Sequence, residues 1–167
     1  MVARQGPPVI TLLIGGTRSG KSEVGERLAA ATGRPVTVVV PDLPISDPEF
    51  AQRIDVHRSR RPPDWRTVEC GPGLVEALGV ADGTVLVDSI GSWVASTEDF
   101  AVDVGALVAA LRARGGDTIV VSEEVGLAVH APTEVGRRVL GAVNTAVAAV
   151  ADAVFLVVAG RRVRLER

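Results

Sequence analysis

The sequence predicts an α/β fold, with a mostly parallel sheet flanked by helices on both faces and an edge strand at the C-terminus. Short, continuously apolar runs such as residues 36–40 (VTVVV) alternate with helical patterns, and such runs are typical of strands buried on both faces. The 167 residues are 47% hydrophobic, which is enough for one domain with its own core. Residues 163–167 alternate apolar and charged side chains, as edge strands do.

The N-terminal elements follow from local patterns. Residues 1–8 read as a flexible tail, so we assign a single domain to residues 9–167. Its first element is a buried strand over residues 9–14, and a helix is expected over residues 21–32. That helix places Val24, Leu28 and Ala31 on one face, and Gly33 supplies its end.

The remaining elements alternate in the same way. A strand over residues 36–40 precedes a helix that starts at Ser46-Asp47-Pro48-Glu49 and runs to about residue 60, before two prolines. Further strands are predicted at residues 66–70, 84–87, 118–122, 154–158 and 163–167, and further helices at residues 102–114 and 135–150.

Composition excludes several classes of protein. A formal net charge of −2 argues against a sequence-independent nucleic-acid binder, which needs a basic surplus. The single cysteine, Cys70, excludes an internal disulfide and suits a reducing cytoplasm. The apolar run at residues 9–14 is too short for a membrane span. We therefore expect a cytoplasmic protein with no nucleic-acid partner and no membrane span.

One motif carries the chemistry. Residues 15–22 (GGTRSGKS) match the phosphate-binding pattern G-x-x-x-x-G-K-[ST] between a strand and a helix, which predicts a P-loop NTPase-like domain. Lys21 is the single lysine among 18 basic residues, which argues against a chance glycine-rich turn. Lys21 is expected to reach the β- and γ-phosphates, and the Ser22 hydroxyl to hold Mg²⁺. The predicted nucleotide-binding residues are Gly15, Gly16, Thr17, Arg18, Ser19, Gly20, Lys21 and Ser22.

An acid at the end of a neighbouring strand is expected to complete the metal site. Asp88 directly follows the strand at residues 84–87 and is the preferred candidate. Glu123 and Glu124, which follow the strand at residues 118–122, are the alternatives.

A second cluster surrounds His57. On a helix, Arg53, His57 and Arg61 are spaced four residues apart, and such cations disfavour the imidazolium. Neutral imidazole is the nucleophilic form. The alternative is that His57 is a structural histidine on a basic, solvated face. The residues alone favour this alternative.

The sequence resembles the bifunctional adenosylcobinamide kinase/adenosylcobinamide-phosphate guanylyltransferase family over nearly the whole chain from Ile10 onward. The resemblance rests on residues 15–22 followed by Arg53-Ile54, His57-Arg58, Arg61-Pro62 and Trp65-Arg66-Thr67-Val68-Glu69, and on Asp88, Glu124-Val125-Gly126-Leu127, Gly136-Arg137-Arg138, Asn144 and Leu156-Val157-Val158-Ala159-Gly160. The chain departs from the family pattern at Val39-Val40-Pro41-Asp42, at Glu123 where asparagine is common, and between Arg138 and Asn144, where it is shorter.

The resemblance implies phosphorylation of adenosylcobinamide with ATP or GTP, and then transfer of GMP from GTP to adenosylcobinamide phosphate. It implies that His57 and Lys21 are catalytic, with GMP carried covalently on His57, and that Ser22 and Asp88 serve Mg²⁺. The resemblance also implies a homotrimer. The nucleotide-contacting positions implied beyond the loop are Val40, Pro41, Asp42, Arg58, Ser59, Arg60, Arg61, Glu69 and Asp88.

Two other functions remain open from the sequence. A P-loop kinase with one activity would need no covalent histidine. A non-catalytic GTP-binding module would need no acceptor substrate.

Overall fold

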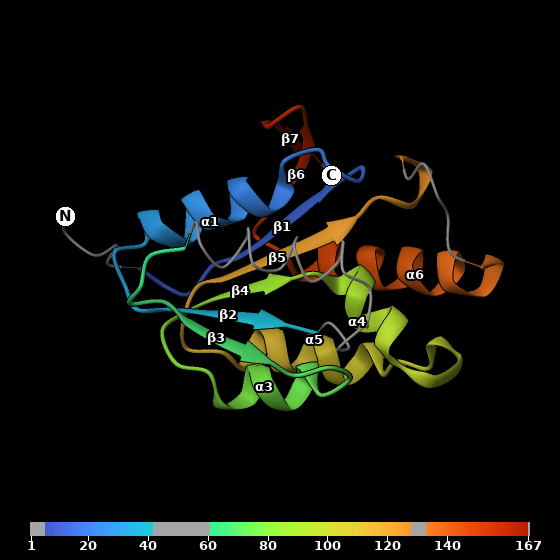
Figure 1. Cartoon of the computed structure of the whole chain (residues 1–167), viewed down its shortest axis with the longest axis horizontal. Helices are drawn as coiled ribbons and strands as arrows, with labels where there is room; N and C mark the ends of the chain where they lie inside the picture. The colour runs from blue at the N-terminus through green and yellow to red at the C-terminus, as the bar shows by residue number, and fades with distance from the viewer. Residues whose placement is uncertain (1–5, 42–60, 128–132, 167) are drawn as a thin grey trace.

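A computed structural model describes residues 6–41, 61–127 and 133–166, which form a seven-stranded sheet with helices on both faces (Figure 1). The strands are β1 (Ile10–Gly15), β2 (Val36–Val40), β3 (Arg66–Glu69), β4 (Thr84–Asp88), β5 (Thr118–Glu123), β6 (Ala153–Val158) and β7 (Arg161–Leu165). The helices are α1 (Lys21–Ala31), α3 (Leu74–Val80), α4 (Ile90–Ser96), α5 (Val104–Ala113) and α6 (Glu134–Val150), with 3₁₀ turns η1 (Glu98–Phe100) and η2 (Val125–Leu127).

The order of the strands determines which loops meet. The order is β3-β2-β4-β5-β1-β6-β7, and every neighbouring pair is parallel except β6 with β7. The carboxyl ends of β1, β4 and β5 therefore lie at one edge of the sheet, where ligands of open α/β sheets bind. The predicted mostly parallel sheet with a C-terminal edge strand is confirmed.

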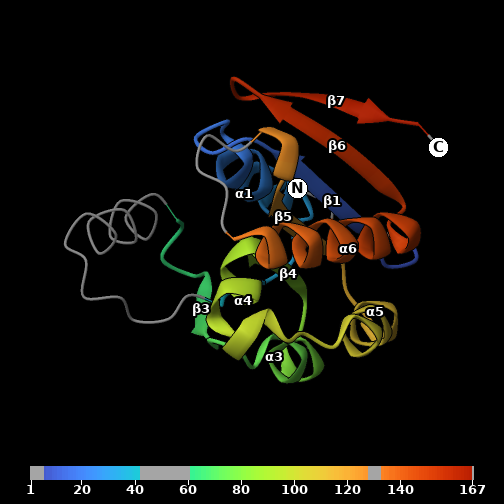
Figure 2. The ribbon, with the colours of Figure 1, turned by 90° about the vertical axis from the view of Figure 1, so that its right-hand side faces the viewer.

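Two apolar cores lie on the two faces of the sheet. On one face, Val24 of α1 packs with Leu13 and Val121 from the neighbouring strands. On the other face, α3, α4, α5 and α6 cover the sheet, and Leu74, Leu107 and other apolar side chains are buried there. Figure 2 shows α1 on one side of β1 and β5 and the remaining helices on the other. The inner strands β2, β4 and β5 are thus buried on both faces, which explains their continuously apolar sequences, whereas the edge strand β7 is exposed.

Two short helices, α3 and α4, were not predicted by the sequence. Each has seven residues, so neither shows a long apolar period. The cap of α4 is Ser89, whose hydroxyl accepts a hydrogen bond from the Ser92 amide at 3.4 Å. Trp93 of α4 is 2% exposed and donates from its indole to the Pro72 carbonyl at 2.9 Å, so it belongs to the core. The helix predicted to start at Ser46 lies outside the described residues.

Arg114 connects several segments by hydrogen bonds at the edge of the sheet where the parallel strands begin. Its guanidinium donates to the carbonyls of Leu78, Ala81 and Gly83 at 2.9, 2.6 and 2.9 Å, and to the Thr118 hydroxyl at 3.0 Å. Burial lowers the pKa of this guanidinium, while the Asp82 carboxylate opposes that shift. These bonds join the segments that precede β4 and β5 at the edge opposite to residues 15–22. None of the described helices is long and apolar enough to cross a membrane.

Candidate nucleotide site

The loop between β1 and α1 curls tightly at the carboxyl edge of the sheet. Its backbone turns through left-handed conformations at Arg18 (φ 58°) and Gly20 (φ 90°), and the Ser19 amide donates to the Gly16 carbonyl at 3.2 Å. A Cβ added at Gly15 would stand 2.4 Å from the carbonyl oxygen of Val157, so only glycine fits there. The curl brings successive backbone N–H groups around the N-terminus of α1, which is the arrangement that binds phosphate.

Lys21 is buried at the start of α1. It is 6% exposed, and its Nζ donates to the Gly16 carbonyl at 2.8 Å across the loop. Burial lowers the pKa of the Lys21 ammonium below its usual range, and the carboxylates of Glu123 and Asp88 counter part of that shift. The loop thus holds a partly desolvated cation, whose hydrogen bond among the described residues is to the Gly16 carbonyl rather than to a carboxylate.

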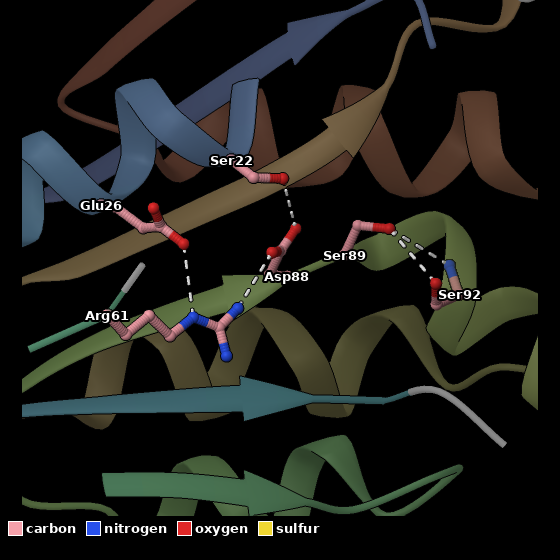
Figure 3. Close-up of polar contacts among 6 residues, drawn as sticks. All are labelled: Ser22, Glu26, Arg61, Asp88, Ser89 and Ser92. Carbon is pink, nitrogen blue, oxygen red and sulfur yellow. Dashed lines mark hydrogen bonds and ion pairs between the residues drawn. The ribbon is translucent and has the colours of Figure 1, made fainter. Parts of the chain in front are cut away.

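Ser22 and Asp88 meet beside the loop. The Ser22 hydroxyl donates to Oδ1 of Asp88 at 3.0 Å, and Oδ2 of Asp88 pairs with Nη2 of Arg61 at 3.4 Å (Figure 3). The Nε of Arg61 pairs with Glu26 at 3.3 Å. The Arg61 side chain is 7% exposed, so it forms a buried bridge between α1 and β4.

The donor set at Ser22 and Asp88 fits Mg²⁺. A hydroxyl and a carboxylate are hard oxygen ligands, and Mg²⁺ sites usually combine one or two such groups with substrate phosphates. Among the described residues, no three His, Cys, Asp or Glu side chains gather into a metal cluster. An ion at this position would therefore depend on Ser22, Asp88 and the phosphates of a nucleotide.

Glu123 and Glu124, the alternatives to Asp88, have other partners. Oε2 of Glu123 accepts from the Ser89 hydroxyl at 3.3 Å, and the Glu123 carbonyl accepts from the Asn144 amide at 2.9 Å. The backbone amide of Glu124 donates to the Gly15 carbonyl at 3.0 Å and so anchors the loop. Of the three acids, Asp88 is the one hydrogen-bonded to Ser22.

The structure brings together only part of the predicted site. The loop residues, Arg61 and Asp88 converge as described above. Val40, Pro41 and Glu69 lie at the carboxyl ends of β2 and β3, on the same edge of the sheet but on the far side of β4 from β5. Asp42, His57, Arg58, Ser59 and Arg60 lie outside the described residues.

Two residues, Glu26 and Asn144, contribute to the site without a role assigned to them from the sequence, although Asn144 is one of the positions that resemble the family. Glu26 lies four residues after Ser22 on α1, so the helical spacing could have indicated that both share a face. Asn144 accepts from the Ser122 hydroxyl at 2.6 Å while it holds the end of β5, and no local pattern signals that long-range contact.

The chain is similar to known proteins over most of its length. Residues 11–165 match the CobU family, described as cobinamide kinase / cobinamide phosphate guanyltransferase. The bifunctional adenosylcobalamin biosynthesis protein CobP of Pseudomonas aeruginosa is 35% identical over 161 residues, which cover 89% of this chain and 92% of that protein. The bifunctional adenosylcobalamin biosynthesis protein CobU of Salmonella typhimurium is 30% identical over 183 residues, covering 95% of this chain and all of that protein (100%).

Solved structures share the fold at low sequence identity. A type III secretion system ATPase has a TM-score of 0.56 at 9% identity, covering 91% of this chain and 52% of that one. The flagellar accessory protein FlaH of Methanocaldococcus jannaschii has a TM-score of 0.51 at 16% identity, covering 93% of this chain and 76% of that one. These likenesses concern the fold alone. The extent of the family match and the identity to two full-length relatives show that this chain belongs to the cobinamide kinase / cobinamide phosphate guanyltransferase family.

Proposed function

We propose that this protein phosphorylates adenosylcobinamide with ATP or GTP and then transfers GMP from GTP to adenosylcobinamide phosphate. The observation that carries the proposal is the buried Lys21 beside the Ser22–Asp88 pair, in a chain that matches this family over residues 11–165. A buried lysine in a curled loop, next to oxygen ligands, suits phosphoryl transfer.

In the kinase step, the hydroxyl oxygen of adenosylcobinamide attacks the γ-phosphorus, the bond from that phosphorus to the bridging oxygen breaks, ADP or GDP leaves, and the hydroxyl proton is released to solvent. The backbone amides of residues 15–22 bind the phosphate chain, and Lys21 stabilises the charge that develops on the transferred group. Ser22 and Asp88 are the residues that would hold Mg²⁺. When bound there, Mg²⁺ would neutralise charge on the β- and γ-phosphates.

In the second step, we infer that the His57 imidazole attacks the α-phosphorus of GTP and that pyrophosphate leaves. The terminal phosphate of adenosylcobinamide phosphate then attacks the guanylyl-histidine, giving adenosylcobinamide-GDP and free His57. This division avoids a direct encounter between two polyanions. Support comes from the family match and from Arg61, four residues after His57, which is ion-paired with Asp88.

A labelling experiment tests the covalent step. The protein is incubated with α-labelled GTP and Mg²⁺, and label is sought on the denatured chain. The wild type and His130→Ala, altered at the second of the two histidines of the chain, should retain label, whereas His57→Ala should not. Covalent GMP on His57→Ala would contradict the assignment.

The same proteins separate the alternative functions. Cobinamide-dependent consumption of ATP or GTP without any adduct would favour a kinase with one activity. Nucleotide binding without consumption would favour a GTP-binding module. From the family resemblance we also infer a cytoplasmic homotrimer, whose mass can be measured by light scattering.

A further inference from the structure

Three buried charges form a bridge beside the phosphate loop, in which Glu26 and Asp88 flank Arg61 (Figure 3). Their side chains are 13%, 14% and 7% exposed, so salt and water screen them little. Asp88 is a residue that would hold Mg²⁺, and the family resemblance implies that Arg61 contacts nucleotide. Glu26 has no part in the steps proposed above, so its place in this Arg61 bridge calls for a reason of its own.

The Arg61 guanidinium is shared between the two carboxylates. Its Nε donates to Oε1 of Glu26 at 3.3 Å, and its Nη2 donates to Oδ2 of Asp88 at 3.4 Å. An arginine holds a single carboxylate best through two parallel bonds of about 2.7–2.9 Å. Because each carboxylate here accepts one longer bond from a different nitrogen, the hold of Arg61 on Asp88 is weaker than a two-bond pair would be.

The charges of the Arg61 bridge do not cancel. Two carboxylates and one guanidinium leave one net negative charge, which favours a cation at Asp88. Without the charge of Glu26, the same guanidinium would neutralise Asp88 alone and could form both of its parallel bonds there. A metal ion would then have to compete with Arg61 for that carboxylate. Both effects of Glu26, on net charge and on bonding, therefore act in the same direction.

The helix α1 fixes Glu26 in register with the phosphate loop. Glu26 lies four residues after Ser22, so both side chains project from the same face of α1, one turn apart (Figure 3). Ser22 donates to Oδ1 of Asp88 at 3.0 Å, while Glu26 reaches Asp88 only through Arg61. One helix face thus contacts Asp88 directly with a hydroxyl and restrains its competing cation with a carboxylate.

We propose that Glu26 is a positioning residue: by holding Arg61, it keeps the Asp88 carboxylate available to the Mg²⁺ that accompanies a bound nucleotide. The proposal rests on the binding of nucleotide at residues 15–22 and of Mg²⁺ at Ser22 and Asp88, as put forward under the proposed function. It adds a residue that acts on metal affinity through Arg61 rather than as a ligand.

Two matched substitutions on α1 test the proposal. Glu26→Gln keeps the shape of the side chain and removes its charge. Glu23→Gln is the control, because Glu23 also pairs with an arginine at 3.3 Å, Arg27, but both of those side chains are exposed. Calorimetry measures GDP binding in EDTA, and then Mg²⁺ binding to each protein saturated with GDP. Glu26→Gln should bind Mg²⁺ about fivefold more weakly or worse, with GDP affinity in EDTA unchanged, whereas Glu23→Gln should match the wild type in both.

A third variant, Glu26→Asp, keeps the charge but places it one methylene farther from Arg61. Its Mg²⁺ affinity should fall between those of the wild type and Glu26→Gln, and it tests the proposal even if Glu26→Gln fails to fold. Wild-type Mg²⁺ affinity in both Glu26 variants would overturn the proposal. So would an equal loss of GDP affinity with and without Mg²⁺, which is the result expected of a merely structural contact. If the wild type itself bound no GDP, nucleotide binding at the loop would fail as well, which is a different result.

Discussion

Lys21 is a buried lysine, and burial disfavours the charged form of its ammonium group. We therefore expect Lys21 to serve ligand binding rather than the stability of the fold. Lys21→Met should lower kcat for phosphoryl transfer by about 10²–10³-fold, the effect of removing one preorganised donor. The melting temperature at neutral pH should not fall, because the variant no longer buries an ammonium group. Steady-state kinetics and thermal unfolding of both proteins check this, and near-normal turnover would contradict the assigned role.

The lowered pKa of Lys21 also sets a pH dependence. Its pKa in the folded protein lies below the value of 10.5 for the free side chain. Below the folded pKa, Lys21 is charged in both states and the full cost of burying the charge is present. Between the two pKa values the unfolded chain binds more protons, so stability rises with pH. If Lys21→Met melts at a higher temperature than the wild type, the difference between the two melting temperatures should therefore shrink as the pH approaches 10. A difference that grows with pH would contradict the predicted rise in the stability of the wild type.

Asp88 is expected to govern the metal requirement. Asp88→Asn keeps the shape of the side chain but loses the charge beside Ser22, so the Mg²⁺ concentration for half-maximal activity should rise about tenfold or more. Glu123→Gln is the matched control, because Glu123 is hydrogen-bonded to Ser89 rather than Ser22. Titrations of activity with Mg²⁺ compare the two variants. If the Mg²⁺ concentration for half-maximal activity rose only in Glu123→Gln, Glu123 rather than Asp88 would be the residue that holds the metal.

At the scale of elements, the Arg114 bonds hold the ends of α3 and α5 to the sheet. Arg114→Lys replaces a planar fork of donors by one ammonium group that cannot reproduce all of these bonds, and each part-buried acceptor that loses its donor costs roughly 1–3 kcal/mol. We expect the free energy of unfolding to fall by about 2–4 kcal/mol in urea titrations. Arg112→Lys, at an exposed position of α5, should change it little. GDP affinity should be the same in both variants, since Arg114 lies at the opposite edge of the sheet from the loop.

The inner strands were predictable from sequence because a strand covered on both faces needs a continuously apolar run such as residues 36–40. The helices α3 and α4 were not, since seven residues span only about two turns. At the site, the motif fixed Lys21 and Ser22, and the end of a strand indicated Asp88. The bridge from Glu26 through Arg61 to Asp88 joins three separate segments, so only the tertiary structure could show it.

At the scale of the whole molecule, ligand binding and folding are coupled. A nucleotide that binds only the folded chain should raise its free energy of unfolding by about 2.7 kcal/mol at a hundred times the dissociation constant. Mg²⁺ with GDP should therefore raise the melting temperature of the wild type, and Lys21→Met should show a much smaller rise. An equal rise in both proteins would place the bound nucleotide away from the loop.

β1 is an interior strand of the sheet, and this position has a consequence for the chain during its synthesis. Ile10 pairs with Thr118, and Thr11 pairs with Ala153, so both neighbours of β1 are synthesised long after it. At about 5–20 residues per second, β1 leaves the ribosome roughly 5–20 s before β5 exists. During that interval an apolar strand has no partner of its own and can pair with other chains. Productive folding must then wait until nearly the whole chain has emerged, which makes a nascent chain of this protein a natural client for chaperones.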